Sequence, residues 1–259
     1  MGTVLLSLPI ATIQPISILA AAFTATSAVT VTGLNVVDTA NYTTFGQLVI
    51  AALIQFGGLG FMTFAILVLT SLQGKMGLSG SITAQEALGT HSNQIGSTAK
   101  AVIKIAFITE GLGFLGLTLL LAPLKGLKDA MYEAFFLCIS AFNNAGFALN
   151  GNNMTAYVHQ PMISFIISLL IITGGIGFLV ILDIIKHKRW QKFTLHTKVM
   201  VLGTLALNII GCILYWLLER HNAKTIGGLS EAGQWFASWF MAVASRTAGF
   251  NNIDRSEEH

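Results

Sequence analysis

Four apolar stretches dominate the sequence, and each is long enough to cross a lipid bilayer as a helix. They cover residues 46–70, 99–121, 161–185 and 199–218. A helix needs about 20 apolar residues to span the hydrocarbon core of a membrane. Charged residues make up 10% of the chain, against about 25% in an average soluble domain. We therefore expect a membrane protein, and the composition argues against a soluble globular domain.

Three shorter apolar segments lie between or beside these stretches, at residues 16–29, 131–142 and 232–243. They are too short to span a bilayer. Segments of this length are often re-entrant or lie at the membrane interface. Both interpretations stay open from length alone.

The basic residues predict how the chain is oriented. "KHKRWQKFTLHTK", residues 186–198, holds five Lys or Arg residues, and loops rich in Lys and Arg stay in the cytoplasm. Alternation then places 71–98 inside as well, and 122–130 and 219–231 outside. The three short segments fall on the outer side. The first basic residue of the chain is Lys75, so the N-terminus lacks the positive region of a signal peptide.

A repeat joins the short segments. "TVTGL" (30–34), "NNAGF" (143–147) and "RTAGF" (246–250) align on their glycines, and we call them the three glycine stretches. "QFGGLGFM" (55–62) and "ITGGIGFL" (172–179) follow the first two. Each unit therefore reads as spanning helix, short helix, glycine stretch and spanning helix with GG-x-GF. Parallel repeats predict units arranged around an axis normal to the membrane.

These observations predict an all-α membrane protein built from repeated helix–pore loop–helix units, of which about two and a half are present. The first unit covers 1–70, with an incomplete first helix. A cytoplasmic loop at 71–98 leads to the second unit at 99–185, and the basic loop at 186–198 leads to the third unit at 199–259. The abrupt ends indicate a fragment of a longer protein.

The glycine stretches have the properties of an ion filter. Non-helical backbone at membrane depth is tolerated where it is buried in protein or lines a watery cavity. Glycine adopts positive φ values, which allow successive carbonyls to face a common axis and replace the hydration shell of a monovalent cation. The alternative is that they are ordinary extracellular turns. The predicted ion-binding residues are Val31, Thr32, Gly33, Asn144, Ala145, Gly146, Thr247, Ala248 and Gly249.

The sequence resembles the membrane subunit of Ktr-type potassium uptake systems, in the Trk/Ktr/HKT superfamily of cation transporters. The resemblance rests on "TSAVTVTGLNVVD" (26–38), "IQFGGLGFMTF" (54–64), "SAFNNAGF" (140–147), "ITGGIGF" (172–178) and "SRTAGFN" (245–251), and it covers nearly the whole chain.

The resemblance implies potassium uptake through one pore formed by four units in one polypeptide, in the cytoplasmic (inner) membrane of a bacterium, which the chain crosses several times. It also implies a homodimer, a cytoplasmic nucleotide-binding regulatory subunit of the RCK type, and sodium as an activating ion in many members. No covalently bound cofactor and no nucleic-acid partner are expected. The second helix of the third unit, its gating loop and the whole fourth unit have no counterpart here. A secondary transporter of different mechanism and a non-transporting truncated fragment remain alternatives.

Isolated polar residues in apolar surroundings are further candidates. Intramembrane carboxylates suggest function by default: Glu110 either pairs within the bundle or lines a vestibule, and Asp183 is expected to pair near the basic loop. Arg246, beside the third glycine stretch, is expected to bond to backbone carbonyls or an acidic partner, with either a filter-stabilising or a purely structural role. "GLGFLG" (111–116) lies inside a spanning stretch, which favours close helix packing over dinucleotide binding.

The sequence does not predict an enzyme. Cys138 and Cys212 lie in apolar stretches and are interpreted as buried small side chains. The histidines have no metal-ligand spacing, and no nucleophile is paired with a base.

Overall fold

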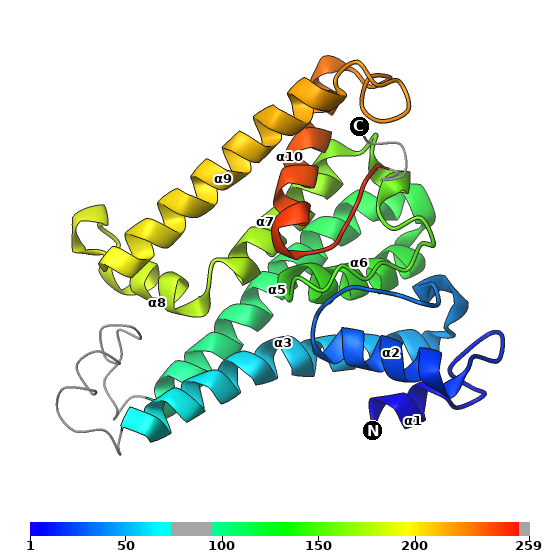
Figure 1. Cartoon of the computed structure of the whole chain (residues 1–259), viewed down its shortest axis with the longest axis horizontal. Helices are drawn as coiled ribbons and strands as arrows, with labels where there is room; N and C mark the ends of the chain where they lie inside the picture. Colours follow the sequence, from blue (N-terminus) through cyan, green and yellow to red (C-terminus); the bar gives the residue numbers. More distant parts are fainter. Residues whose placement is uncertain (74–94, 254–259) are drawn as a thin grey trace.

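The computed structural model describes the backbone of residues 1–73 and 95–253, and the side chains of residues 1–60 and 100–253. Within those ranges the chain forms helices and no β-strand, apart from an isolated backbone bridge between Thr12 and Tyr42 (Figure 1). The predicted all-α class is confirmed for the described residues.

The three short apolar segments are helices: α2 (Ile18–Val29), α6 (Leu127–Phe142) and α10 (Glu231–Thr247). A serine begins two of them, since Ser17 Oγ accepts from Ala20 N at 3.1 Å and Ser230 Oγ accepts from Gly233 N at 3.3 Å. Such caps satisfy backbone donors that the first helical turn leaves free. Each helix ends immediately before or within a glycine stretch.

Three long helices match predicted spans: α3 (Thr44–Gln73), α5 (Ile95–Lys125) and α9 (Leu195–Glu219). At 1.5 Å per residue each is roughly 40 Å long, which exceeds the ~30 Å hydrocarbon core. Among the residues described with side chains, Lys100–Lys125 and Leu195–Glu219 are long and apolar enough to cross a membrane by themselves.

The predicted span 161–185 is not one straight helix. It consists of α7 (Pro161–Gly175) and α8 (Phe178–His187), bent by 92° at the break between them. Gly177 has φ +96°, a conformation that interrupts an α-helix and that glycine adopts without a Cβ clash. Phe178 follows the break and is buried, with its ring centroid 6.0 Å from that of Phe142.

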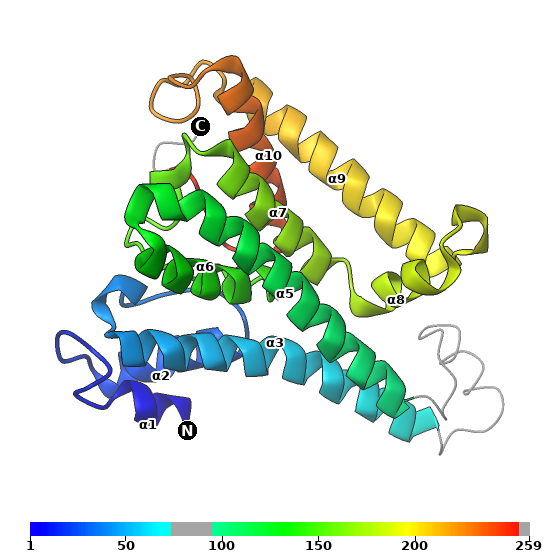
Figure 2. The same ribbon diagram turned by 180° about the vertical axis from the view of Figure 1, so that it is seen from behind.

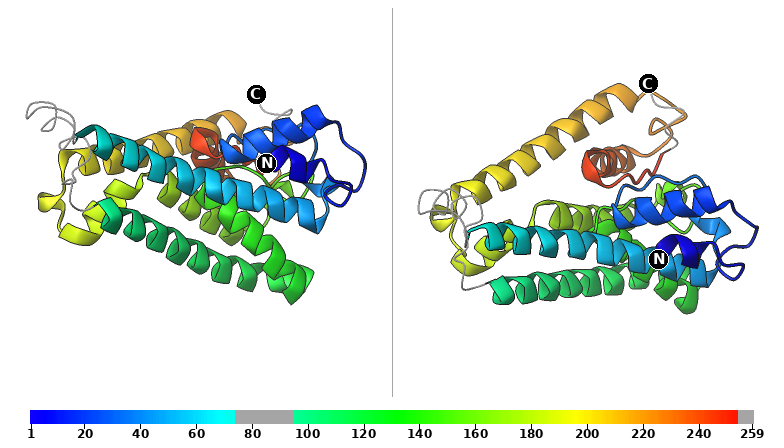
Figure 3. Two further views of the ribbon diagram at one scale, coloured as in Figure 1. Left: turned by 90° about the horizontal axis from the view of Figure 1, so that it is seen from below. Right: turned by 60° about the horizontal axis from the view of Figure 1, so that its bottom comes forward.

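Helices α6 and α10 pack against the longer helices. Helix α10 packs between α9 and α7, α6 contacts α5, α7 and α3, and α2 packs on α3 and on the short α1 (Gly2–Leu6) (Figures 1 and 2). Figure 3 shows α9 on the opposite side of α10 from α3 and α5. Three 3₁₀ turns complete the described elements, at Thr39–Asn41, Thr155–Tyr157 and Trp190–Lys192.

Two apolar clusters hold the glycine stretches in place. Phe147, which follows the second glycine, is fully buried in a cluster formed by α1, α2, α3 and α6. Phe250, which follows the third glycine, is fully buried in a larger cluster formed by α5, α6, α7 and α10. Burying a phenylalanine stabilises by about 1.5–3 kcal/mol, so each ring anchors the backbone beside its glycine.

Apolar side chains also cover the outside of the long helices. Leu202, Leu205 and Ile213 of α9 are exposed. Such an apolar helix surface is unfavourable in water and is stable against the hydrocarbon chains of a lipid bilayer. The chain is a membrane protein.

Candidate ion-binding site

The three glycine stretches are far apart in the sequence and meet in space. Gly33, Gly146 and Gly249 have φ values of +78°, +74° and +68°. A methyl group on Gly33 would overlap the carbonyl oxygen of Ala145, and one on Gly146 would overlap the carbonyl oxygen of Ala248. The first stretch therefore touches the second, and the second touches the third.

The third glycine closes the group more loosely. A methyl group on Gly249 would lie 3.8 Å from Gly146 Cα and 3.9 Å from the carbonyl oxygen of Thr32. Three carbonyls at the same aligned position, those of Thr32, Ala145 and Ala248, thus lie next to a glycine of another stretch. Six of the nine predicted site residues are brought together in this way.

The first stretch begins with a tight turn at the end of α2. Thr32 N donates to Ser27 O at 2.9 Å and Val31 N donates to Ala28 O at 3.3 Å, the pair of bonds that ends a helix in a Schellman motif. The motif places Val31 in the left-handed region, with φ +55°. This conformation is a true outlier for a β-branched residue.

The second stretch repeats this turn at the end of α6. Ala145 N donates to Ser140 O at 2.7 Å and Asn144 N donates to Ala141 O at 3.1 Å. Asn144 has φ +59°, which asparagine tolerates better than valine. The same backbone geometry therefore forms from two different sequences.

The third stretch differs. Helix α10 continues to Thr247, two positions closer to its glycine than α2 and α6 come to theirs, and Gly249 N donates to Ala244 O at 3.2 Å. Thr247 Oγ1 donates to Asn144 Oδ1 at 2.8 Å. Val31 and Asn144 are thus turn residues, whereas Thr247 is the last residue of a helix.

Two cavities lie near the glycine stretches. One is lined by helix ends that precede the glycines in sequence, and the other mainly by residues that follow them. The helix-end cavity, of about 650 Å³, is lined by the ends of α2, α6 and α10 and by the GG motifs of α3 and α7. The asparagine-rich cavity, of about 540 Å³, is lined mainly by residues that follow the glycines, including Asn35, Asn152, Asn153 and Asn251, and also by Asp38, Lys224 and Thr225. One cavity is thus formed by helix ends before the aligned glycines, together with the GG motifs, and the other mainly by residues after the glycines.

The electrostatics of the helix-end cavity favour a cation. No charged side chain is among the described residues that line it. The C-termini of α2, α6 and α10 end at this cavity, and a helix C-terminus has a partial negative charge of about half an elementary charge. Backbone carbonyl oxygens are suitable ligands for a hard monovalent ion.

The GG-x-GF motifs bring the long helices against the short ones. A methyl group on Gly57 would overlap Val29 O at the end of α2, and one on Gly174 would overlap Phe142 O at the end of α6. The second glycine of the first motif, Gly58, instead faces Asn143 of the next unit, whereas a methyl group on Gly175 would lie in ordinary contact with Asn144 and Thr247.

Asparagines support the second glycine from the other cavity. Asn153 Nδ2 donates to Gly146 O at 3.2 Å, and Asn153 Oδ1 accepts from Asn251 N at 3.4 Å. Met154 N donates to Asn251 O at 3.0 Å. The sequence analysis did not single out these residues. The polar run "NGNN" (150–153) after the second stretch was the available signal.

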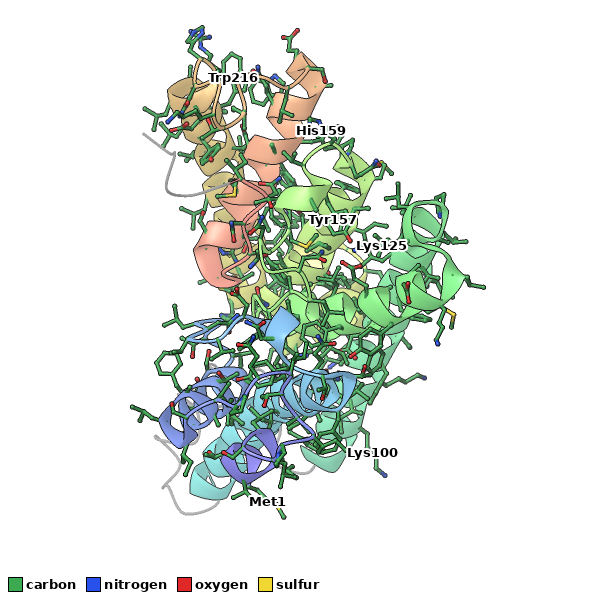
Figure 4. All side chains as sticks on the ribbon, turned by 90° about the vertical axis from the view of Figure 1, so that its right-hand side faces the viewer. Met1, Lys100, Lys125, Tyr157, His159 and Trp216 are labelled. Carbon is green, nitrogen blue, oxygen red and sulfur yellow. The ribbon has the colours of Figure 1, made fainter. Side chains whose placement is uncertain are left out.

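An ion pair between exposed Lys125 and buried Glu133 anchors the chain that leads from the second glycine back to α7. Glu133 accepts from Lys125 Nζ at 2.6 Å, from Tyr157 Oη at 2.5 Å and from Asn150 Nδ2 at 3.0 Å (Figure 4). Burial, together with the hydrogen bond to Glu133, raises the pKa of Tyr157, which keeps the phenol protonated as a donor. Sequence analysis missed this pair, because Glu133 lies within an apolar segment.

The other polar candidates have mixed outcomes. Asp183 Oδ1 lies 2.6 Å from His187 Nδ1, and its Oδ2 accepts from Thr194 N at 3.0 Å, so the expected pairing near the basic loop is present. The Nη1 atom of Arg246 is buried without a hydrogen-bond partner among the described residues. The bond expected there is not found, and the role of Arg246 stays a prediction.

Two further expectations concern α5 and the cysteines. A methyl group on Gly113 would press on Leu170 and Cys138, and one on Gly116 would lie 3.0 Å from Ile166. These two glycines of "GLGFLG" therefore serve the packing of α5 on α7 and α6, whereas a methyl group on Gly111 would meet no atom within 4 Å. Cys138 and Cys212 are free and buried, as predicted.

Sequence comparison decides the family. The TrkH family, described as "Cation transport protein", matches residues 3–259. The chain belongs to this family. The Ktr system potassium uptake protein B of Bacillus subtilis (strain 168) is 47% identical to it over 256 residues, covering 98% of this chain and 57% of the relative. The protein of the same name from Vibrio alginolyticus is 42% identical over 262 residues, covering 99% of this chain and 57% of that relative.

The TrkH-family fold is also found by structural comparison. The crystal structure of the potassium transporter TrkH from Vibrio parahaemolyticus matches with a TM-score of 0.67 and 18% identity, covering 94% of this chain and 47% of that one. The chain therefore spans about half the length of these relatives. The relatives are named as transporters, so the prediction of a non-enzymatic function is confirmed.

Proposed function

We propose that this chain forms part of a pathway for potassium uptake across the bacterial cytoplasmic membrane, which the protein crosses several times. The ion passes through a filter made of backbone carbonyls of the three glycine stretches. The observation that carries the proposal is the convergence of Gly33, Gly146 and Gly249, with one cavity lined by helix ends before them in sequence and another lined mainly by residues after them. Two relatives are named as potassium uptake proteins, which supports potassium as the ion.

The chemistry of the site suits potassium better than calcium. Carbonyl oxygens replace the water shell of a weakly hydrated monovalent cation, whereas calcium sites use carboxylates. None of the three glycine stretches contains a carboxylate. Each stretch has one glycine, so we expect fewer well-formed ion sites, and weaker selectivity, than in channels whose filters have two.

We further propose that the segments 1–70, 99–185 and 199–259 are pore units, and that a fourth unit completes the filter. Gly33 and Gly146 each press on the carbonyl of the following stretch, whereas the nearest atom to a methyl group on Gly249 lies 3.8 Å away. This looser contact supports a further stretch that would pack against Gly249 as the others pack against each other.

Regulation forms the last part of the proposal. We propose that the protein works as a homodimer with a cytoplasmic nucleotide-binding subunit of the RCK type, and that sodium activates uptake. Two relatives are named as components of a "Ktr system", which supports a multi-component assembly. The protein needs no covalently bound cofactor in this proposal.

The proposal is tested by substituting the second glycine. Gly146→Ser, in the protein expressed at its full natural length, should weaken selectivity for potassium over sodium and raise the potassium concentration needed for half-maximal uptake, because any side chain there displaces the Ala248 carbonyl. Uptake is measured in cells that lack other potassium uptake systems. Gly203→Ala in α9, where a methyl group meets no atom within 4 Å, is the matched control. Unchanged selectivity in well-expressed Gly146→Ser protein would rule out the filter.

A further inference from the structure

Glu110 is a carboxylate in the middle of the apolar helix α5, and its side chain is buried at 7% exposure. A carboxylate in such surroundings is expensive unless it is hydrogen-bonded, and intramembrane carboxylates are retained for function more often than for stability. Helix α5 packs on the outside of the glycine stretches and does not line the helix-end cavity. Any influence of Glu110 on the ion path must therefore pass through another residue.

The contacts of Glu110 identify that residue. Gln55 Nε2 donates to Glu110 Oε2 at 3.0 Å, and Asn143 Nδ2 lies 3.4 Å from Glu110 Oε1. Asn143 Nδ2 also donates to Gln55 Oε1 at 2.8 Å. The three side chains form a closed ring that joins α3, α5 and the end of α6.

Asn143 is the residue of this ring that reaches the proposed filter. It is the C-cap of α6, immediately before the left-handed Asn144, and it lines the helix-end cavity. Its Nδ2 donates to Ile139 O at 2.9 Å, and a methyl group on Gly58 would overlap its Oδ1. The side chain is thus held by hydrogen bonds on one side and by close packing on the other.

The aligned residues of the other stretches have no such connection. Thr30 is anchored within its own stretch, since Thr30 Oγ1 donates to Thr26 O at 2.8 Å and lies 2.6 Å from Thr32 Oγ1. Arg246 has a buried nitrogen without a partner among the described residues. Among the described residues, Asn143 is the one of these three whose hydrogen bonds tie its stretch to a carboxylate on a peripheral helix.

We propose that Glu110 is a positioning residue for ion selectivity: through Asn143 and Gln55 it fixes the turn at Asn144 and so the direction of the Ala145 carbonyl. This inference rests on the proposed filter. It predicts that Glu110 affects which ion is transported more than the maximal rate, because the ring sets carbonyl geometry without touching the ion.

The ring allows an exchange experiment. Glu110→Gln keeps the shape of the side chain and turns one acceptor oxygen into a donor, which faces either Gln55 Nε2 or Asn143 Nδ2. The double variant Gln55→Glu, Glu110→Gln retains all three donor–acceptor pairs with the carboxylate on α3 instead of α5. The control is Thr118→Val, which lies on the same helix as Glu110. It removes a buried hydroxyl that has no hydrogen-bond partner among the described residues.

The measurement is the ratio of potassium to sodium uptake, together with the maximal potassium uptake rate, in the full-length protein. Glu110→Gln loses a hydrogen bond to a charged group and places its new amide donor against another donor. We expect this to lower the ratio of potassium to sodium uptake about tenfold. The double variant should return to within about threefold of the parent, and Thr118→Val should equal it.

Two outcomes would overturn the inference. One is an unchanged ion ratio in folded Glu110→Gln protein, and the other is a double variant no better than Glu110→Gln. If Glu110→Gln does not fold, Gln55→Met, which removes both amide contacts, decides in the same way. Gly146→Ser is measured in parallel. If Gly146→Ser loses selectivity while Glu110→Gln does not, only the inference about Glu110 fails. If neither variant loses selectivity, the filter itself is misassigned.

Discussion

At the residue scale, the least expected feature is the left-handed valine that ends α2. Val31 and Asn144 occupy the same position in equal turns, with φ +55° and +59°. A β-branched residue held in this region costs about 1–3 kcal/mol and persists where the surrounding structure requires it. No sequence rule would place valine there, and the alignment of the glycines predicted a non-helical stretch but not this turn.

Exchanging these two residue types tests the strain. Val31→Asn should stabilise the protein by about 1 kcal/mol, because asparagine adopts the left-handed region more easily. Asn144→Val should destabilise it by at least as much, since it also loses the hydrogen bond from Thr247 Oγ1. The midpoint of thermal unfolding in detergent measures both. A lower midpoint for Val31→Asn would show that Val31 is held by packing and not strained.

At the element scale, the positions of the helices followed from apolar length and the bend did not. The predicted segments 16–29, 131–142 and 232–243 correspond to α2, α6 and α10. The motif GG-x-GF, however, lies within one continuous helix in α3 and at a 92° break between α7 and α8. Since the local sequence is nearly the same, the difference depends on tertiary contacts such as Phe178 on Phe142, which pattern cannot reveal.

The first glycines of the two motifs should be equivalent in their effect on stability. Gly174→Ala and Gly57→Ala each place a methyl group against the final carbonyl of a short helix, and overpacking of this kind destabilises by about 1–3 kcal/mol. Both variants should lower the thermal unfolding midpoint, whereas Gly203→Ala in α9 should not. A Gly174→Ala protein as stable as its parent would show that α7 moves freely away from α6.

At the scale of the whole molecule, the repeat was the strongest guide. Alignment of three glycines predicted that segments more than a hundred positions apart in sequence would meet, and Gly33, Gly146 and Gly249 do meet. The supporting polar contacts could not be predicted, because Glu110, Glu133 and Asn153 find partners on other elements. Periodicity reports which backbone segments are equivalent, whereas the hydrogen bonds between side chains depend on how the units differ.

The basic loop 186–198, which the sequence predicts to face the cytoplasm, carries exposed residues at its centre. Lys188 has left-handed φ +51° and ends α8, and it is exposed together with Arg189 and Trp190. By the positive-inside rule its charges predict that the loop stays on the cytoplasmic side. Near a membrane surface they also attract anionic lipid, by about 1 kcal/mol per basic residue. We predict that the loop in addition forms part of the docking surface for the proposed regulatory subunit, since an exposed aromatic beside charges is typical of protein interfaces.

Reversing two of these charges separates the three roles. In the full-length protein, Lys188→Glu with Arg189→Glu should reduce both co-purification of the regulatory subunit and nucleotide-dependent activation, because like charges would then face an acidic partner surface. Insertion topology is checked by cysteine labelling from each side of the membrane, and lipid binding by flotation with anionic and neutral vesicles. Lys100→Glu with Lys104→Glu, which places the same charge change on exposed positions of α5, is the control. If both partner readouts persist with intact topology and only binding to anionic vesicles falls, the loop contacts lipid and not the subunit.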